Sequence, residues 1–370
     1  MKEKCLIVFG GKSVEHDISI ITAMQMKNFI EEDFVYVYID KSGIWWTAEN
    51  ADDINTYVNF FKKAKKKKRV IVSSGENVLL IEKHKKYVPF FKIKSVLNCC
   101  HGNIGEDGAL QGLFRCSNIP QSSPGVCSSA ICMDKAFVKD VLKANNILTP
   151  EGKTIKKAEF FEKKDEILGE ISDLTFPLIV KPANLGSSIG ISVCNNATEL
   201  EDGIELAFEF DDKVVCEKMV ENLREFNCAC FCVGENLFTS DVLEVENKSK
   251  IFSFDDKYIS AGVKNSKPSE NLSKKVKDLT EKVYAIFDCQ GIVRIDFLYD
   301  NKSRKLYVNE LNTIPGSLSC HMFKDIDFKE VLSSVLAQAK ENNSKKNKLI
   351  TTFDSDAIST YIKSTRTLKK

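Results

Sequence analysis

The sequence has almost no net charge. Its 53 lysine and arginine residues face 52 aspartate and glutamate residues, which leaves a formal net charge of +1 at neutral pH. Without an excess of one sign, no overall field attracts nucleic acid or an anionic membrane, and neither is expected as a partner. Any polyanion that binds must therefore be held by a local group of side chains.

The sequence also lacks the features of an exported or membrane-anchored protein. No apolar run is long enough to cross a bilayer. Met1 to Cys5 leads directly into a short apolar strand, and not into the apolar segment of a signal peptide. None of the 13 cysteines form a CxxC spacing, which favours reduced thiols over a disulfide framework. We therefore expect a cytoplasmic protein.

Three of the cysteines, Cys228, Cys230 and Cys232, alternate at period two and so share one face of a predicted strand. Free cysteine is usually buried, so small core residues are the favoured interpretation. A metal site on that face is the alternative.

The apolar residues are numerous enough for several cores. Hydrophobic residues make up 43% of the 370 positions, which predicts two or three domains. A helix is expected from Ser13 onward, with Ile18, Ile21 and Met24 on its buried face. Buried strands are predicted at Cys5 to Phe9, Val35 to Ile39 and Ser95 to Cys100. This order predicts an open α/β layer whose loops at the strand ends are available for ligands.

One strong charge run, Lys62 to Arg69, interrupts this layer. It has no interleaved aromatic residues and lies where a surface connection is expected, so a solvated loop is the favoured interpretation. A nucleic-acid patch is the alternative.

Further elements are predicted along the rest of the chain. A helix begins at Met133, short strands cover Pro177 to Pro182 and Val214 to Glu217, and a helix covers Phe328 to Lys340. The tail from Leu349 has few apolar residues to pack and is expected to be partly ordered at best.

A predicted β-hairpin is the most informative segment. Its strands are Val293 to Leu298 and Lys305 to Leu311, joined by a turn at 300–303. Side chains two apart on a strand share a face, so Arg294 and Asp296 face together and Glu310 and Asn312 do the same. The intervening apolar residues supply a dry opposite face at Val293, Ile295 and Phe297.

The polar face of this hairpin has the chemistry of a magnesium site. Asp296, Glu310 and Asn312 offer oxygen ligands, and magnesium prefers a few carboxylates plus phosphate oxygens to a complete protein cage. Arg294 beside them suits an anion that develops charge during reaction. An exposed ladder of cross-strand pairs is the alternative.

A glycine- and serine-rich loop at 186–190 follows Lys181-Pro182. Its small residues and free backbone donors suit phosphate. It is not a Walker loop, since no Lys-Ser or Lys-Thr pair follows the glycines.

Together these segments resemble the D-alanine–D-alanine ligases of the ATP-grasp superfamily, from Glu15 to about Gly316. The resemblance rests on seven segments in the family order: Glu15-His16-Asp17 with Ser19, HGNIGEDG at 101–108 with Gln111-Gly112, Met133-Asp134-Lys135, Lys181-Pro182 through 186–188, DKY at 256–258, RIDF at 294–297 and NELNTIPG at 309–316. It implies an α/β, three-domain ATP-grasp fold, with an N-terminal open α/β domain and two α+β domains that clamp ATP. The expected ranges are 1–134, 135–225 and 226–345, followed by a polar tail at 346–370.

The resemblance also implies an ATP site and a metal site. Lys135, Lys181 and Lys257 would reach the phosphates. The hinge from Glu217 through Lys218 to Val220 would hold adenine, and Glu225 the ribose. The remaining nucleotide contacts would come from Ser187, Ser188 and Phe297. Magnesium, with manganese as the alternative, would be held by Asp296, Glu310 and Asn312.

For the amino-acid substrates, the resemblance implies that Glu15 binds the ammonium group of the first D-alanine. Ser187 and Tyr258 would complete a hydrogen-bonded set with it, and a mobile loop at 252–267 would close over the site. Further roles fall on His101 near the reacting carboxylate, and on Arg294 and the Gly316 N–H at the tetrahedral oxyanion.

The chain departs from the family pattern at two places. Leu185 stands where an acidic or small residue is usual. His321, followed by Met322, stands where a serine near the carboxylate of the second substrate is expected. The second substrate could therefore be D-alanine, D-serine or D-lactate.

The expected reaction joins two D-alanines through an acyl phosphate, and the family implies a homodimer. A related ATP-grasp ligase with another second substrate is the nearer alternative. A catalytically silent nucleotide-binding regulator is the alternative of another class, and the intact set of Lys181, Asp296, Glu310 and Asn312 argues against it.

Overall fold

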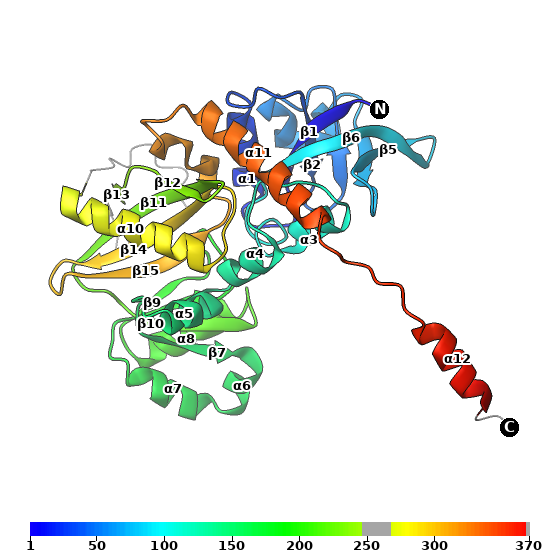
Figure 1. The fold of residues 1–370 in the computed structure, drawn as a ribbon. Helices are drawn as coiled ribbons and strands as arrows, with labels where there is room; N and C mark the ends of the chain where they lie inside the picture. The colour runs from blue at the N-terminus through cyan, green and yellow to red at the C-terminus, as the bar shows by residue number, and fades with distance from the viewer. Residues whose placement is uncertain (246–267, 368–370) are drawn as a thin grey trace.

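The structure, a computed structural model, describes residues 1–245 and 268–367, with side chains described up to residue 364. The strands form three separate sheets, and helices pack against each of them (Figure 1). Across these two ranges, no helix is both long and apolar enough to span a membrane.

The N-terminal sheet is closed. Its strands are β1 (Glu3–Gly10), β2 (Phe34–Ile39), β3 (Trp45–Thr47), β4 (Lys68–Val72), β5 (Val78–Lys83) and β6 (Lys86–Asn98). β1 lies between β2 and β6 and is parallel to both, whereas antiparallel pairs connect β2 through β3, β4 and β5 to β6. The prediction of an open N-terminal sheet is therefore wrong.

The closing strands were missed because they are short and half-exposed. β3 has no buried residue, and β4 buries only Val70 among its five positions. β4 also begins with Lys68 and Arg69, the end of the basic run that was predicted to be a solvated loop. Such strands have no apolar run that would mark them in the sequence. The strands predicted at β1, β2 and the end of β6 are present.

Helix α1 (His16–Met26) packs on β1 and begins three residues later than predicted. Ile18 is buried as expected, but Ile21 is 41% exposed, so the predicted buried face is wrong at that position. The buried residues of α1 include the polar Ser19 and Thr22, which bond to other elements. An apolar periodicity does not detect a helix that buries polar side chains.

The second sheet has the order β7-β10-β8-β9. Its strands are β7 (Gly152–Lys156), β8 (Leu178–Pro182), β9 (Ser192–Cys194) and β10 (Lys213–Lys218), and its helices are α6 (Lys157–Glu162), α7 (Lys164–Ser172) and α8 (Ala197–Ala207). The predicted strands correspond to β8 and β10, which pair antiparallel with Lys181 opposite Val215.

Three helices connect the first sheet to the second: α3 (Ala109–Cys116), α4 (Val126–Met133) and α5 (Lys135–Ala144). The helix predicted to begin at Met133 is α5, which begins two residues later, and α4, which was not predicted, ends at Met133. The Asp134 carboxylate accepts from the backbone N–H groups of Ala136 and Phe137, which caps α5.

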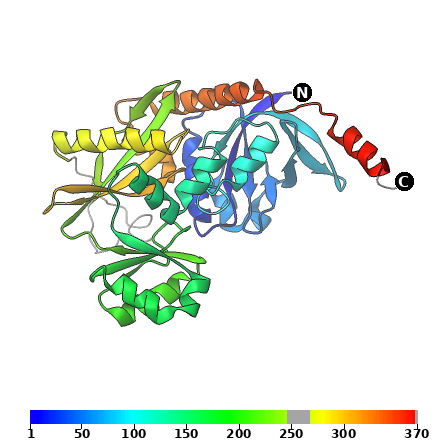
Figure 2. The same cartoon turned by 60° about the horizontal axis from the view of Figure 1, so that its bottom comes forward.

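The third sheet runs β12-β11-β14-β15, with β13 paired to β11. Its strands are β11 (Leu223–Val233), β12 (Asn236–Thr239), β13 (Leu243–Val245), β14 (Val293–Asp300) and β15 (Lys305–Asn312), and helix α10 (Glu270–Ile286) covers one face (Figure 2). The predicted hairpin is β14 and β15. Cys228 and Cys230 are fully buried in the core between α10 and this sheet, as predicted for small core residues.

The C-terminal helix α11 (Phe328–Asn347) extends beyond its predicted end at Lys340 and packs into the same core as Ile7 and Phe9 of β1. The tail then leaves the body, and α12 (Ala357–Thr367) stands apart from it in both views (Figures 1 and 2). The predicted domain boundaries at 134, 225 and 345 remain predictions. The second falls inside β11 and the third inside α11.

Candidate active site

Segments that are far apart in the sequence meet around Glu15. Glu15 is the N-cap of α1 and is 7% exposed. Its Oε1 atom accepts a hydrogen bond from the Ser187 hydroxyl in the glycine- and serine-rich loop. The backbone is in the left-handed conformation at both Ser187 and Ser188, with φ of 57° and 58°. The structure thus brings together the two residues predicted to orient the first ammonium group.

The loop after β6 closes tightly on the same carboxylate. Gly102 has φ of +70°, and a Cβ atom added there would lie 2.7 Å from Glu15 Oε2 and 2.5 Å from Ser13 Oγ. Glycine is required here both for its left-handed backbone and for the close approach.

His101 is 4% exposed and bonds through Nε2 to Thr22 Oγ1 of α1 (2.8 Å). Burial lowers the pKa of His101 to about 4, so the imidazole is neutral at pH 7. A hydrogen bond with the backbone of Ile314 acts in the opposite direction, and the positive charge of Arg294 lowers the pKa further. His101 is therefore placed between α1 and the loop that follows β15.

Glu106 joins these loops and was not assigned a role from the sequence. Its Oε2 accepts from Gly102 N (2.8 Å), and its Oε1 accepts from Ile314 N (2.8 Å) and Thr313 Oγ1 (3.1 Å). Burial and the neighbouring Glu15 charge raise the pKa of Glu106, and these hydrogen bonds offset part of that rise. Glu106 thus couples the His101 loop to the Pro-Gly turn.

Lys181 and Glu217 form the centre of the predicted nucleotide side. Lys181 Nζ lies 2.8 Å from Glu217 Oε2 and donates to Asn309 Oδ1 (3.1 Å). Lys139 Nζ lies 2.8 Å from the other oxygen, Glu217 Oε1, and also donates to Thr149 Oγ1 and the Pro150 carbonyl. One buried carboxylate therefore holds two lysines.

This arrangement determines the charge of Glu217. Burial alone would raise its pKa, but Lys181 and Lys139 outweigh burial and hold the pKa at about 2. Burial lowers the pKa of Lys139. The ion pair favours the charged form of Glu217, while burial disfavours the charged form of Lys139 and offsets part of that stabilisation.

Lys135, at the start of α5, points toward the same region. Its Nζ donates to the backbone carbonyl of Leu185 (2.6 Å) and lies 4.0 Å from Glu310 Oε2. Because the contact uses the carbonyl of Leu185, the unusual side chain at that position is not part of it.

The polar face of the hairpin is as predicted. Arg294 is directly opposite Asn312, and Asp296 directly opposite Glu310. The Arg294 guanidinium binds Asp296 through two bonds, Nε to Oδ1 (2.6 Å) and Nη2 to Oδ2 (2.7 Å). Asn312 Nδ2 donates to Asp296 Oδ2 (3.1 Å). The opposite residues Val293, Ile295 and Phe297 are fully buried.

The donor set fits a magnesium ion that also takes phosphate oxygens. Two carboxylates and one amide face the same way, which is fewer ligands than a complete protein cage requires. In the described part of the chain, no three or more histidine, cysteine, aspartate or glutamate side chains are grouped so that they could hold a metal ion by themselves. On the neighbouring strand, Asn227 donates to Asp296 Oδ1 (3.2 Å) in the amide orientation that satisfies its contacts.

The other residues predicted for the nucleotide site lie on several different elements. Glu225 lies on β11, Lys218 ends β10, and Val220 follows it. Phe297 is in the core below the hairpin face, so its side chain does not reach the polar side. Lys257, Tyr258 and the predicted closing loop at 252–267 lie outside the described residues.

Residues 316–322 form a short 3-10 segment, η2 (Gly316–Met322), which carries the predicted second-substrate residues. The backbone N–H of Ser317 donates to Thr22 Oγ1 (3.1 Å). His321 is at the surface, yet partial desolvation and the charge of Arg294 lower its pKa, whereas Met322 is buried.

Several site residues were missed because nothing in the sequence marks them individually. They are Thr22, Glu106, Lys139, Asn227 and Asn309. Lys139 had a usable signal, because it lies one helical turn after Lys135 and therefore on the same face.

Comparison with known proteins agrees with this geometry. Residues 4–124 match the family described as D-ala D-ala ligase N-terminus, and residues 141–332 match D-ala D-ala ligase C-terminus. A D-alanine--D-alanine ligase of Thermosipho melanesiensis is 36% identical over 95% of this chain and 97% of its own length. One of Caldicellulosiruptor bescii is 34% identical over 94% of this chain and 98% of its own length.

Two solved structures share the fold. The D-Ala:D-Ser ligase VanG of Enterococcus faecalis is 29% identical with a TM-score of 0.78, covering 92% of this chain and all of its own (100%). The D-alanine-D-alanine ligase of Helicobacter pylori is 26% identical with a TM-score of 0.76, covering 91% and 98%. The multidomain α/β architecture is that of an ATP-grasp ligase, and the chain belongs to the D-alanine–D-alanine ligase family.

Proposed function

We propose that this protein joins two D-alanine molecules at the expense of ATP, giving D-alanyl-D-alanine for peptidoglycan precursors, and that it does so in the cytoplasm as a homodimer. The observation that carries the proposal is the hydrogen bond between Ser187 and Glu15. It joins the loop that follows Lys181, on the nucleotide side, to the carboxylate that would bind an ammonium group.

The chemistry follows from the demands of the reaction. A carboxylate does not acylate an amine directly, so a carboxylate oxygen of the first D-alanine attacks the γ-phosphorus of ATP. This forms an acyl phosphate and releases ADP. The free amine of the second D-alanine attacks the acyl carbon, a proton leaves the nitrogen, and phosphate departs as the peptide bond forms.

Glu15 and Ser187 orient the first substrate by its ammonium group, and His101 lies within the same cluster of loops. Arg294, together with the Gly316 N–H, stabilises the oxyanion that develops on the acyl carbon. The charge of Arg294 acts on both His101 and His321, which supports its position between the two substrate regions.

Lys135, Lys181 and Lys257 neutralise the transferring phosphoryl group. In this structure Lys135 and Lys181 already contact Glu310 and Glu217, so ATP binding is an exchange of partners. Magnesium, or manganese in its place, supplies charge stabilisation at the phosphates, and Asp296, Glu310 and Asn312 would hold it.

The proposal is tested by phosphate release from ATP. Turnover should require magnesium and should be stimulated by D-alanine and not by L-alanine, because Glu15 and Ser187 orient one enantiomer. Equal stimulation by both enantiomers would refute the substrate assignment. Nucleotide binding without turnover for any D-amino acid would favour a silent regulator.

A second candidate, a ligase that uses D-serine as second substrate, is favoured by His321 and by the similarity to VanG. A competition between D-alanine, D-serine and D-lactate, with products separated by mass at pH 6 and pH 8, distinguishes the candidates. D-alanyl-D-alanine should dominate and should increase at pH 8, where more free amine is available. Dominant D-alanyl-D-serine would assign the second pocket to D-serine.

A further inference from the structure

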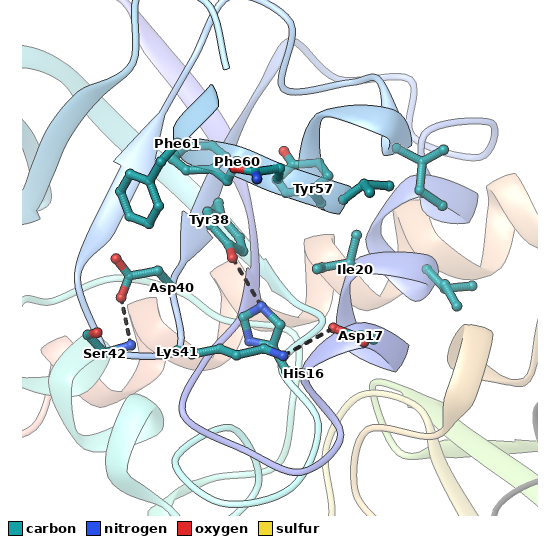
Figure 3. Close-up of a pocket in the computed structure, with 14 residues that line it drawn as sticks. His16, Asp17, Ile20, Tyr38, Asp40, Lys41, Ser42, Tyr57, Phe60 and Phe61 are labelled. Carbon is teal, nitrogen blue, oxygen red and sulfur yellow. Dashed lines mark hydrogen bonds and ion pairs between the residues drawn. The ribbon is translucent and has the colours of Figure 1, made fainter. Parts of the chain in front are cut away.

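A second cavity, of about 570 Å³, lies beside α1 (Figure 3), and none of the residues that line it was given a role in the active site. Its walls come from α1, from the segment after β2, and from η1 (Ile54–Asn59) and α2 (Phe60–Lys63). This volume is within the range of small-molecule sites. None of the proposed catalytic steps uses it.

Helix α1 separates this cavity from the active site. Glu15, Ser19 and Thr22, spaced four and three residues apart, bond to active-site loops. Asp17 and Ile20, on another side of the helix, line the cavity. The first two turns of α1 therefore contact both sites.

Four aromatic side chains form one wall of the cavity. Tyr38 packs against Tyr57 and Phe60 with ring centroids 5.0 and 4.6 Å apart, and Phe61 extends the wall. Val58, 77% exposed, adds an aliphatic edge. Such a wall suits a planar apolar group, and aromatic faces also attract cations.

The polar end of the cavity favours a hydrogen-bond donor with positive charge. Asp17 lies there with the Lys41 ammonium group 3.8 Å away. The second carboxylate, Asp40, is buried and accepts from the backbone N–H groups of Ser42 and Ile44 and from Trp46 Nε1. The two carboxylates exceed the single cation in charge, and Asp17, whose side chain is 78% exposed, is the one that a ligand can reach.

The Tyr38 hydroxyl adds a further acceptor. His16 Nδ1 lies 2.6 Å from the Gly11 carbonyl, which can only accept, so Nδ1 carries the proton. Burial lowers the pKa of His16 and keeps the ring neutral, which makes Nε2 an acceptor for the Tyr38 hydroxyl (3.1 Å). The Tyr38 oxygen then retains acceptor capacity for a donor in the cavity.

We propose that this cavity binds a small aromatic amine, with its ring against Tyr38, Tyr57 and Phe60 and its ammonium group at Asp17. Because α1 begins at the residue after Glu15, an occupant that holds its first turn also restrains Glu15. Binding is therefore coupled to the first D-alanine, and this second part rests on the proposed function of Glu15.

The test uses the full-length chain and three ligands of similar shape: 2-phenylethylamine, 2-phenylethanol and 3-phenylpropionate. Isothermal titration calorimetry should show the amine binding about tenfold more tightly than the carboxylate, with the alcohol between them, as expected when attraction replaces repulsion at one charged group. Equal or tighter binding of the carboxylate would overturn the proposed chemistry.

Two variants locate the binding. Val58→Arg places a cation on the exposed edge of the cavity and should weaken amine binding about tenfold. Asp17→Asn should weaken it about fivefold, the effect of one partly exposed charge pair. Leu206→Arg makes the same change at a residue of α8 that is 49% exposed and distant from the cavity, and binding should be unchanged. If Val58→Arg has no effect, or if D-alanine displaces the amine competitively, the ligand binds elsewhere and the proposal fails.

The coupling is read from initial rates. Saturating amine should lower the KM for the first D-alanine about fivefold, because a restrained helix turn reduces the ordering cost at Glu15, and should leave the KM for ATP unchanged. Binding with no change in the KM for D-alanine would overturn the coupling. Absence of D-alanine-dependent turnover would instead overturn the proposed function, and the binding result would stand.

Discussion

The two ends of the active site treat buried charge differently. At the nucleotide end, carboxylates hold cations of the protein itself: Glu217 binds Lys139 and Lys181, and Asp296 binds Arg294 through both oxygens. At the amino-acid end, Glu15 accepts from the Ser187 hydroxyl, and Glu106 accepts from a hydroxyl and from backbone N–H groups.

This difference matches the ligands. ATP and magnesium bring both negative and positive charge, so the nucleotide end can exchange partners while its own charges remain compensated. An amino acid brings an ammonium group to Glu15, which accepts from the Ser187 hydroxyl. We expect substitutions at the nucleotide end to leave uncompensated buried charge, and those at the amino-acid end to act mainly on substrate affinity.

The largest effect is expected for Asp296→Asn. The substitution removes a predicted metal ligand and leaves the Arg294 guanidinium without its ionic partner. Turnover should fall at least about 1000-fold, which corresponds to roughly 4 kcal/mol in the barrier. Phosphate release is the measurement, and circular dichroism checks that the fold is retained.

The matched control is Asp300→Asn, the same change on the same strand. Asp300 lies at the other end of β14, four residues beyond Asp296, and caps the hairpin turn by accepting from the N–H groups of Lys302 and Ser303. Its turnover should stay within about threefold of the unmodified protein, less than 1 kcal/mol. Turnover of Asp296→Asn within about tenfold would refute the metal assignment.

The next effect is expected for Lys139→Met, which leaves Glu217 with Lys181 alone. We expect the KM for ATP to rise about tenfold, because Lys181 is then held more firmly by Glu217 and exchanges less readily to phosphate. Lys143→Met, one turn further along α5 and exposed, is the control and should be unchanged.

The same variant should shift acid unfolding. The Glu217 pKa of about 2 lies below its ordinary value of 4.5, so its contribution to stability is complete above pH 4.5 and is lost as the pH falls toward 2. Losing Lys139 raises that pKa, so unfolding followed by fluorescence should begin at a higher pH. An unchanged acid transition would contradict the role given to the pair.

An effect of similar size, on a different kinetic constant, is expected at the amino-acid end for Glu106→Gln. Both Glu106 oxygens accept from donors, so the new amide group must face an N–H or O–H group and loosen the link between Gly102 and Ile314. The kcat/KM for D-alanine should fall about tenfold, the cost of about one buried hydrogen bond, with the KM for ATP unchanged. An increase of the same size in the KM for ATP would contradict the expectation that substitutions at the amino-acid end act mainly on amino-acid affinity.

The smallest effect is expected when the tail is deleted from Leu349. Residues 349–364 are exposed throughout, so the melting temperature and turnover should be nearly unchanged. Deletion from Phe328 is the contrast, because it removes Val331, Leu332 and Val335 from a core and should prevent folding. A large loss on deletion of the tail alone would show that the tail packs on the body.

Sequence patterns predicted the strands well where a strand buries one face or both faces. Alternation on β14 and β15 correctly placed Asp296 and Glu310 on one face and Phe297 in the core. The closure of the first sheet could not be predicted, because β3 and β4 bury too little to leave a pattern. Ile21 was predicted to be buried because the prediction followed the spacing of apolar residues. The buried face of α1 instead includes hydroxyl groups, which that spacing does not detect.

For the site, the resemblance selected residues that the structure brings together, such as Glu15 with Ser187. It did not single out Lys139, Glu106 or Thr22, which act by bonding to other site residues. The contacts of Glu106 and Thr22 depend on three-dimensional placement, and no local spacing encodes them, whereas Lys139 lies one helical turn after Lys135 on α5. Glu225, Lys218 and Val220 remain predictions for the nucleotide site, and Phe297 lies in the core.

The packing of α11 has a consequence for biosynthesis. Val331 and Leu332 share a core with Ile7 and Phe9 of the first strand, and β1 pairs with β6, which ends at Asn98. During translation, β1, α1 and β2 emerge early, but the second strand partner of β1, β6, ends only at Asn98, and α11 comes near the end of synthesis. The core of the N-terminal unit is therefore completed late, and a nascent chain halted before Phe328 would still expose the part of this core that α11 covers.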